Sequence, residues 1–88
     1  MPPSWCVYIV RCADGSLYTG IANNAARRAA EHNDGGPLAA KYTRARRPVV
    51  LVYEESCASR SAAARREHAI KRLARRDKLS LIAQGHTG

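Results

Sequence analysis

Large apolar side chains are scarce in this sequence of 88 residues. It contains no phenylalanine and one tryptophan, and much of its 45% apolar share is alanine. A chain of this length buries a smaller fraction of its surface than a longer one, so we expect a modest core and marginal stability. The length also leaves no room for a second domain. We therefore expect one domain over residues 1–88, with residues 1–4 and 86–88 frayed.

Paired cysteines and long apolar runs are also missing. Cys6, Cys12 and Cys57 are odd in number and lack the spacing of a zinc site, so we expect reduced thiols. No apolar run approaches the roughly 20 residues of a membrane span. No signal peptide pattern precedes the first strand-like segment. These absences predict a soluble cytoplasmic protein without a membrane partner.

Acidic residues are few, and basic residues outnumber them about two to one. Fifteen lysines and arginines, most of them arginine, stand against seven acids, and the formal net charge is +8. The planar guanidinium group matches a phosphate in a bidentate geometry, and such a surface attracts polyanions. The charge favours a nucleic-acid partner, although a solubilising surface would give the same composition.

The order of elements predicts an α/β fold. Residues 5–12, 17–21 and 49–54 are typical of strands, and Asp14-Gly15 predicts a tight turn between the first two. The unbroken apolar run of the third strand suggests a central position, covered on both faces.

Helices are expected between and after the strands. Asn23 would cap a helix over 24–33, Ser59 or Ser61 a helix over 60–74, and Gly85 would close a last helix over 76–84. A short helical turn could lie within 37–47. The order ββαβαα describes a small three-stranded, mainly antiparallel sheet flanked by helices.

Five polar residues are candidates for a site. Tyr8 and Tyr18 lie on strands joined by a tight turn, Arg28 and His32 project from one helix edge, and Glu67 lies at the rim of a buried helix face. Singly, each has a structural explanation, such as packing for a tyrosine or an intrahelical ion pair for the glutamate.

Together, these residues follow a known pattern. Cys6-Val7-Tyr8 and, after nine residues, Tyr18-Thr19-Gly20 resemble the paired tripeptides that name the GIY-YIG nuclease family. In that pattern an arginine follows the second glycine by eight residues, a histidine or tyrosine comes four later, and a glutamate lies on a later helix. Arg28, His32 and Glu67 match these positions.

The chain is most similar to the small stand-alone, YhbQ-like branch of that family. The stretch from Tyr42 to Val49 and the helix from Glu67 to Lys71 carry this likeness. The incision domain of UvrC and a structure-specific nuclease subunit are more distant relatives. The resemblance implies a three-stranded sheet flanked by helices, in agreement with the pattern of strands and helices above.

The resemblance also implies an activity: a divalent-metal-dependent endonuclease that hydrolyses phosphodiester bonds in DNA, acting at branched or damaged structures in repair. Glu67 would hold one Mg²⁺ or Mn²⁺ ion, Arg28 would bind the phosphate, and Tyr8 or Tyr18 would activate a water with His32 as a neighbour. The resemblance does not decide which tyrosine is the base, or whether the substrate is DNA or RNA.

Further residues are candidates for nucleic-acid binding. A basic stretch with one aromatic residue suits backbone tracking and stacking, Lys71 could reach a phosphate, and Gly20 would let a ligand approach the strand end. The stretch consists of Lys41, Tyr42, Arg44, Arg46 and Arg47.

Three positions depart from the family pattern. Cys6 replaces a glycine, Ile21 stands where some members carry a lysine, and Gln84 is the one candidate for a downstream amide. The alternative is therefore a catalytically weak or inactive nucleic-acid-binding module, or an adaptor for a repair partner, with the same fold. A protein partner could then supply the substrate specificity.

Overall fold

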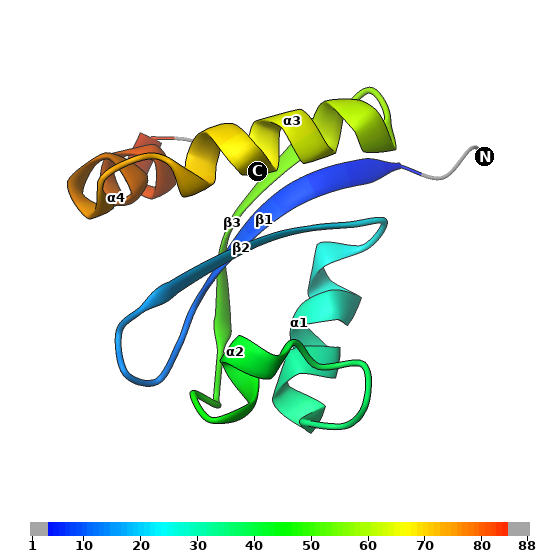
Figure 1. Ribbon diagram of the computed structural model, residues 1–88, viewed down its shortest axis with the longest axis vertical. Coiled ribbons are helices and arrows are strands. Elements are labelled where there is room, and N and C mark those ends of the chain that lie inside the picture. The colour runs from blue at the N-terminus through cyan, green and yellow to red at the C-terminus, as the bar shows by residue number, and fades with distance from the viewer. Residues whose placement is uncertain (1–3, 85–88) are drawn as a thin grey trace.

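The computed structural model describes residues 4–84, and a three-stranded antiparallel sheet lies at its centre (Figure 1). The strand order is β2-β1-β3, and the strands are β1 (Trp5–Arg11), β2 (Leu17–Ala22) and β3 (Val50–Cys57). The expected fraying at residues 1–3 and 86–88 and a helix end at Gly85 lie outside the described residues. Ser4 is described and exposed, and its carbonyl accepts a hydrogen bond from the Asn23 side chain at 3.1 Å.

The predicted antiparallel fold is confirmed, but the predicted place of the third strand is wrong. β1 occupies the centre and pairs with both neighbours, Tyr8 lying opposite Gly20 on β2 and Glu54 on β3. β3 is an edge strand, and Val50 is 51% exposed. An unbroken apolar run indicates burial on both faces, and residues 6–10 of β1, all buried, are the run that meets that condition.

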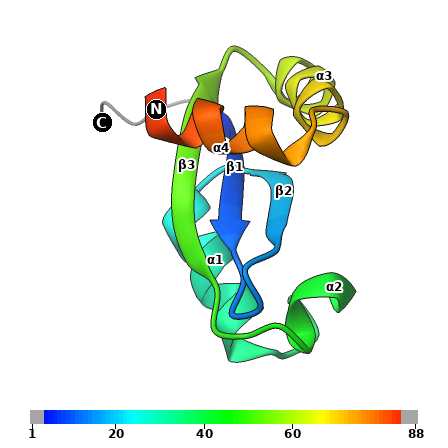
Figure 2. The ribbon, with the colours of Figure 1, turned by 90° about the vertical axis from the view of Figure 1, so that its left-hand side faces the viewer.

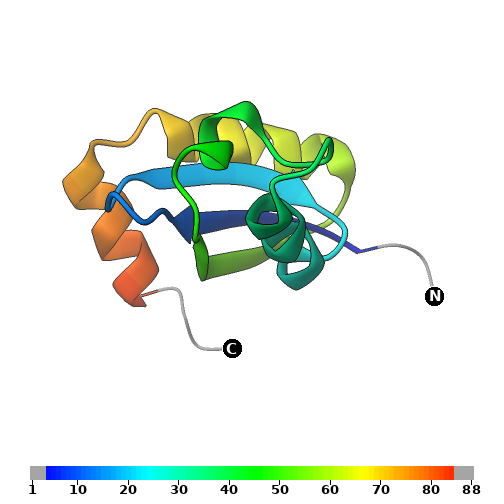
Figure 3. The same ribbon diagram turned by 90° about the horizontal axis from the view of Figure 1, so that it is seen from below.

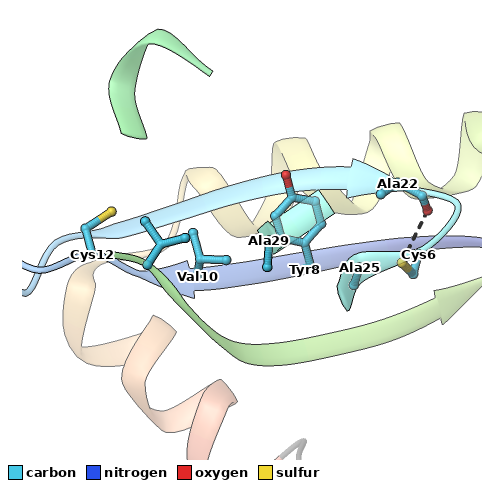
Figure 4. Packing of buried hydrophobic residues seen from close by; sticks show 8 residues of the cluster. Cys6, Tyr8, Val10, Cys12, Ala22, Ala25 and Ala29 are labelled. Atoms are coloured by element: carbon cyan, nitrogen blue, oxygen red, sulfur yellow. Dashed lines mark hydrogen bonds between the residues drawn. The ribbon is translucent and has the colours of Figure 1, made fainter. Parts of the chain in front are cut away.

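The two faces of β1 enter two separate cores. Cys6, Tyr8 and Val10 pack with Ala25 and Ala29 of α1 (Ala25–Asp34), as Figure 4 shows. On the opposite face, Val7 and Ile9 pack with Tyr53 and Ile70 under α3 (Arg60–Lys71) and α4 (Arg75–Gln84). Alternation along one strand thus divides the molecule into a helix layer on each side of the sheet (Figures 1 and 3).

The helix ends follow the capping rules, and one predicted cap is wrong by a single residue. Asn24, rather than Asn23, caps α1 by accepting a hydrogen bond from the backbone N–H of Arg27 at 2.9 Å. Gly35 ends this helix with a φ of 71°, a conformation that favours glycine. Ser59, one of the two expected caps, accepts from the N–H of Ala62 at 3.1 Å.

Two further helices complete the fold. The expected helical turn is α2 (Lys41–Arg44), which lies beside the end of α1. α4 turns back from α3 across the sheet (Figure 2), and the Arg75 guanidinium donates to the carbonyl of Gly15 in the hairpin turn at 3.0 Å. No helix within residues 4–84 is long and apolar enough to cross a membrane.

Candidate active site

A buried chain of hydrogen bonds links the central strand to α1 and α2. The Tyr8 hydroxyl lies 2.8 Å from Nε2 of His32, and Nδ1 of His32 lies 2.9 Å from Oγ1 of Thr43. Thr43 in turn donates to the carbonyl of Ala40 at 2.9 Å. Tyr8 is 1% exposed, and His32 and Thr43 are fully buried. Polar groups this deep need partners, and this chain supplies them.

Gly20 explains how the Tyr8 phenol reaches His32. The ring extends from β1 across β2 (Figure 4) and passes directly over Gly20, where a Cβ atom would lie 2.5 Å from the Tyr8 hydroxyl oxygen. Gly20 is itself buried. The close approach predicted at this glycine is therefore made by Tyr8, and Gly20 does not lie open to a ligand.

Tyr18 joins the same cluster through its ring. It lies edge-on to His32, with ring centroids 5.4 Å apart, and stacks with Tyr42 at 5.8 Å. The Arg46 guanidinium lies 3.9 Å from the centroid of the Tyr42 ring and pairs with Asp14 at 3.1 Å. The Tyr42 ring thus contacts its own chain, although the residue is 39% exposed.

Arg28 lies beside this cluster and is held in place. One of its guanidinium nitrogens pairs with Glu31 at 3.1 Å and also donates to the carbonyl of Leu38. Its side chain is 27% exposed, so one part of the guanidinium group is anchored while another faces solvent. The charge of Arg28 reaches both Tyr8 and His32, since it lowers the pKa of each.

Glu67 lies on α3, in the helix layer on the opposite side of the sheet from α1. It lies at the rim of α3, its side chain is 24% exposed, and its carboxylate pairs with Lys71 at 3.2 Å. Its negative charge makes a small contribution to raising the pKa of Tyr8, after burial and Tyr18. Lys71, a candidate phosphate ligand, is the ion-pair partner of Glu67 here.

The surroundings push two pKa values apart. Burial, with Tyr18 next in size, raises the pKa of Tyr8 to about 12. Burial and then the Arg28 charge lower the pKa of His32, and Glu31 opposes them. At neutral pH the buried pair is therefore an uncharged phenol beside an uncharged imidazole.

The remaining basic candidates lie beyond α1. Lys41 and Arg44 are exposed on α2, and Arg47 follows them. Among residues 4–84, no carboxylate lies within ion-pair distance of Arg44 or Arg47, which bond to backbone carbonyls instead. A depression of about 530 Å³ lies between them, lined by Asn33, Arg44, Ala45, Arg47 and Pro48.

Two residues at the site carry no role in the sequence-based prediction. Thr43 holds His32, and Asn33 binds both backbone groups of Val49, donating to its carbonyl at 2.9 Å and accepting from its N–H at 2.6 Å. The contact of Thr43 with His32 and the contacts of Asn33 with Val49 each join residues far apart in the sequence. The one available signal was the position of Thr43 inside the Tyr42–Val49 stretch.

The structure shows where the three residues that depart from the family pattern lie. Cys6 is buried, and its thiol donates to the carbonyl of Ala22 at 3.2 Å. Ile21 packs against the core under α3. Gln84 is exposed near the end of α4, and its amide bonds to Ser80 at 3.2 Å.

Nearly all of the described chain matches one family. The model of the GIY-YIG catalytic domain matches residues 4–80. The UPF0213 protein DP2720 of Desulfotalea psychrophila is 55% identical over 86 residues, which are 98% of this chain and 77% of that protein. The UPF0213 protein SH2523 of Staphylococcus haemolyticus is 54% identical over 78 residues, which are 89% of this chain and 93% of that protein.

Solved structures agree. The solution structure of the UPF0213 protein BH0048 from Bacillus halodurans has a TM-score of 0.59 and 40% identity, over 96% of this chain and 88% of that one. The protein EF2693 from E. faecalis has a TM-score of 0.58 and 37% identity, over 97% and 92% of the two chains. The chain therefore belongs to the GIY-YIG catalytic domain family, with small UPF0213 proteins among its relatives, and this membership supports a nuclease-type function.

Proposed function

We propose that this chain is a single-domain, divalent-metal-dependent endonuclease that hydrolyses phosphodiester bonds in DNA. The observation that carries the proposal is the buried hydrogen bond between Tyr8 and His32, with Arg28 and Glu67 close enough to influence the pKa of Tyr8. Burying a phenol and an imidazole lowers stability unless both are paired. A reaction that moves a proton between them explains why both are there.

The residues present suit a metal ion that keeps its own water. Within residues 4–84, no group of three or more His, Cys, Asp or Glu side chains could enclose an ion. Glu67 supplies one half-buried carboxylate, which fits a hard cation such as Mg²⁺ or Mn²⁺ that retains several waters. When bound, such an ion would supply positive charge to the phosphate and to the departing oxygen.

Arg28 is the group that would bind the phosphate. Its anchor on Glu31 and the Leu38 carbonyl holds the guanidinium in place before substrate arrives. Such a pre-positioned donor can stabilise charge on a non-bridging oxygen as it develops, at little cost in reorganisation. Tyr18 completes the wall of the site through its contact with His32.

Tyr8 is the tyrosine that we assign as the proton acceptor for water. Its hydroxyl is the one bonded to His32, so a proton taken from water at the Tyr8 oxygen can pass onward to Nε2. The pKa of Tyr8 is about 12 and that of His32 lies below 6.5. Full transfer of the proton from Tyr8 to His32 is therefore strongly disfavoured, so in the proposed mechanism the two proton transfers accompany the attack of water rather than precede it.

The basic residues beyond α1 would follow the nucleic-acid backbone. Arg44 and Arg47, which lack carboxylate partners among the described residues, and the exposed Lys41 are suited to phosphate contacts. Contacts with backbone phosphates depend on the shape of the nucleic acid and not on its base sequence. This fits a substrate that is recognised by its structure, such as branched or damaged DNA.

The test is single-turnover cleavage of end-labelled branched DNA with Mg²⁺, Mn²⁺ or EDTA. Wild type should cut only with a metal ion. Tyr8→Phe should lower the rate about 100-fold, within the range of a lost general base, and Tyr18→Phe should lower it far less. Salt-sensitive binding without cutting under any metal condition would favour the second candidate, a binding module or adaptor without turnover.

A further inference from the structure

We infer that Thr43 is a positioning residue that sets the tautomer of His32 and so makes its Nε2 the proton acceptor for Tyr8. This inference deepens the proposed function, on which its activity readout rests, while the state of the imidazole can be measured without any activity. Thr43 is fully buried on α2, and its Oγ1 lies 2.9 Å from Nδ1 of His32.

The count of buried donors assigns the protons. The Tyr8 hydroxyl is buried, and its hydrogen-bond partner among the described residues is Nε2 of His32. Oγ1 of Thr43 gives its own hydrogen to the carbonyl of Ala40, so towards Nδ1 it can only accept. The proton of the neutral ring is therefore on Nδ1, and Nε2 is left to accept from the Tyr8 hydroxyl. Nδ1–H then donates to Thr43, whose own hydroxyl donates to the carbonyl of Ala40.

A competing arrangement lies close by. The backbone N–H of Ala40 points at the same Nδ1 from 3.4 Å. It can only donate, so it favours the opposite tautomer, with the proton on Nε2. The shorter contact with Thr43 decides between the two. Removal of the Thr43 oxygen leaves Ala40 as the remaining polar partner of Nδ1, and the ring should then invert its tautomer. An inverted ring would donate to Tyr8 and could not take its proton.

The experiment compares wild type, Thr43→Val and Thr43→Ser by long-range ¹H–¹⁵N correlation spectra of the histidine rings near neutral pH. His32→Gln identifies the His32 signals against those of His68 and His86. Wild type and Thr43→Ser should show a protonated Nδ1 and an unprotonated Nε2. Thr43→Val, which keeps the shape without the hydroxyl, should show the reverse. It should also cut DNA about 10- to 100-fold more slowly, with unchanged DNA binding.

The outcomes separate this inference from the proposed function. A wild-type ring protonated on Nε2 would overturn the inference, and this result needs no variant to fold. A Thr43→Val ring that stays protonated on Nδ1 would also overturn it. Absence of cleavage in wild type, together with the expected spectra, would contradict the nuclease proposal and leave the assignment of the tautomer in place.

Discussion

Gly20 shows at the scale of one residue how a missing side chain builds the site. The Tyr8 ring occupies the space where a Cβ atom would lie, 2.7 Å from its Cζ. Gly20 belongs to the second tripeptide of the family pattern, and here the strand needs a glycine because the Tyr8 phenol crosses it.

Gly20→Ala should therefore destabilise the fold by about 1–3 kcal/mol, the range for overpacking a filled site. Urea unfolding measures this loss. In the Tyr8→Ala background the same substitution should have a much smaller effect, because the ring that it meets is absent. Equal losses in the two backgrounds would show that Gly20 is needed for another reason.

His32 should make stability depend on pH. Its pKa is below 6.5 in the folded protein, because burial and Arg28 outweigh Glu31, while Tyr8 beside it is uncharged. Well above pH 6.5 the ring is neutral in both states and contributes no pH dependence. Below pH 6.5 the unfolded chain takes up a proton that the folded chain does not, so the free energy of unfolding falls as the pH falls.

Urea unfolding at pH 7.5 and 5.5 checks this sign. Wild type should lose up to about 1 kcal/mol more between these pH values than His32→Gln, because one pKa unit corresponds to roughly 1.4 kcal/mol. His68→Gln on the exposed face of α3 should behave like wild type. An identical pH dependence in wild type and His32→Gln would contradict the buried neutral state of His32.

At the scale of elements, α3 is oriented by a polar contact on the sheet. The Arg66 guanidinium bonds to both carboxylate oxygens of Glu55 on β3, at 3.1 and 2.9 Å. Tyr53, 4% exposed, donates to the same carboxylate. This contact sets the rotation of the helix that carries Glu67, one residue beyond Arg66.

Arg66→Met should lower stability by roughly 1 kcal/mol, the net value of a typical hydrogen bond, and it should weaken cleavage because Glu67 loses its fixed position. Chemical denaturation and cleavage rates provide the measurement. Arg65→Met is the matched control, since Arg65 is exposed one position earlier on the same helix and bonds to Ser61. Equal effects of the two changes would rule out a special role for Arg66.

Local pattern predicted the elements well and their placement less well. The alternation of β1, the Asp14-Gly15 turn and the Ser59 cap are short-range features, and all were expected. The centre of the sheet was assigned to the wrong strand, because residues 6–10 and 49–53 are both apolar runs and strand order depends on pairing between distant residues.

The same limit applies to the site. The spacing of Arg28 and His32 puts both on α1, and the family pattern adds Tyr8 and Glu67. The contact between His32 and Thr43 spans 11 positions and depends on how α2 folds against α1. Periodicity within one element carries no information on such a contact.

At the scale of the whole molecule, the positive charge is unevenly neutralised. Arg27, Arg28, Arg46 and Arg66 pair with carboxylates. Arg44 and Arg47 bond to carbonyls and, like the arginines of α3 and α4 other than Arg66, pair with no carboxylate among the described residues, which leaves their charge available to a polyanion. This part of the surface therefore offers the charge that nucleic-acid phosphates would need.

DNA affinity should fall steeply with salt, and Arg44→Ala or Arg47→Ala should each reduce the log–log slope by about 1, as expected for one lost phosphate contact. Fluorescence anisotropy over a range of salt concentrations measures this slope. Arg27→Ala, which removes an arginine already paired with Glu31, should change the slope less. A larger change for Arg27 would place the DNA path on the outer face of α1.

The measurement that tests the central claim most directly is nicking of supercoiled plasmid by wild type, Glu67→Gln and Glu54→Gln, with Mg²⁺ or Mn²⁺ against EDTA. Glu54 is an exposed carboxylate on β3 and serves as the matched control. We expect metal-dependent nicking by wild type and Glu54→Gln that is lost in Glu67→Gln. Nicking that persists in Glu67→Gln, or plasmid left intact by wild type with either metal ion, would contradict a metal-dependent nuclease at this site.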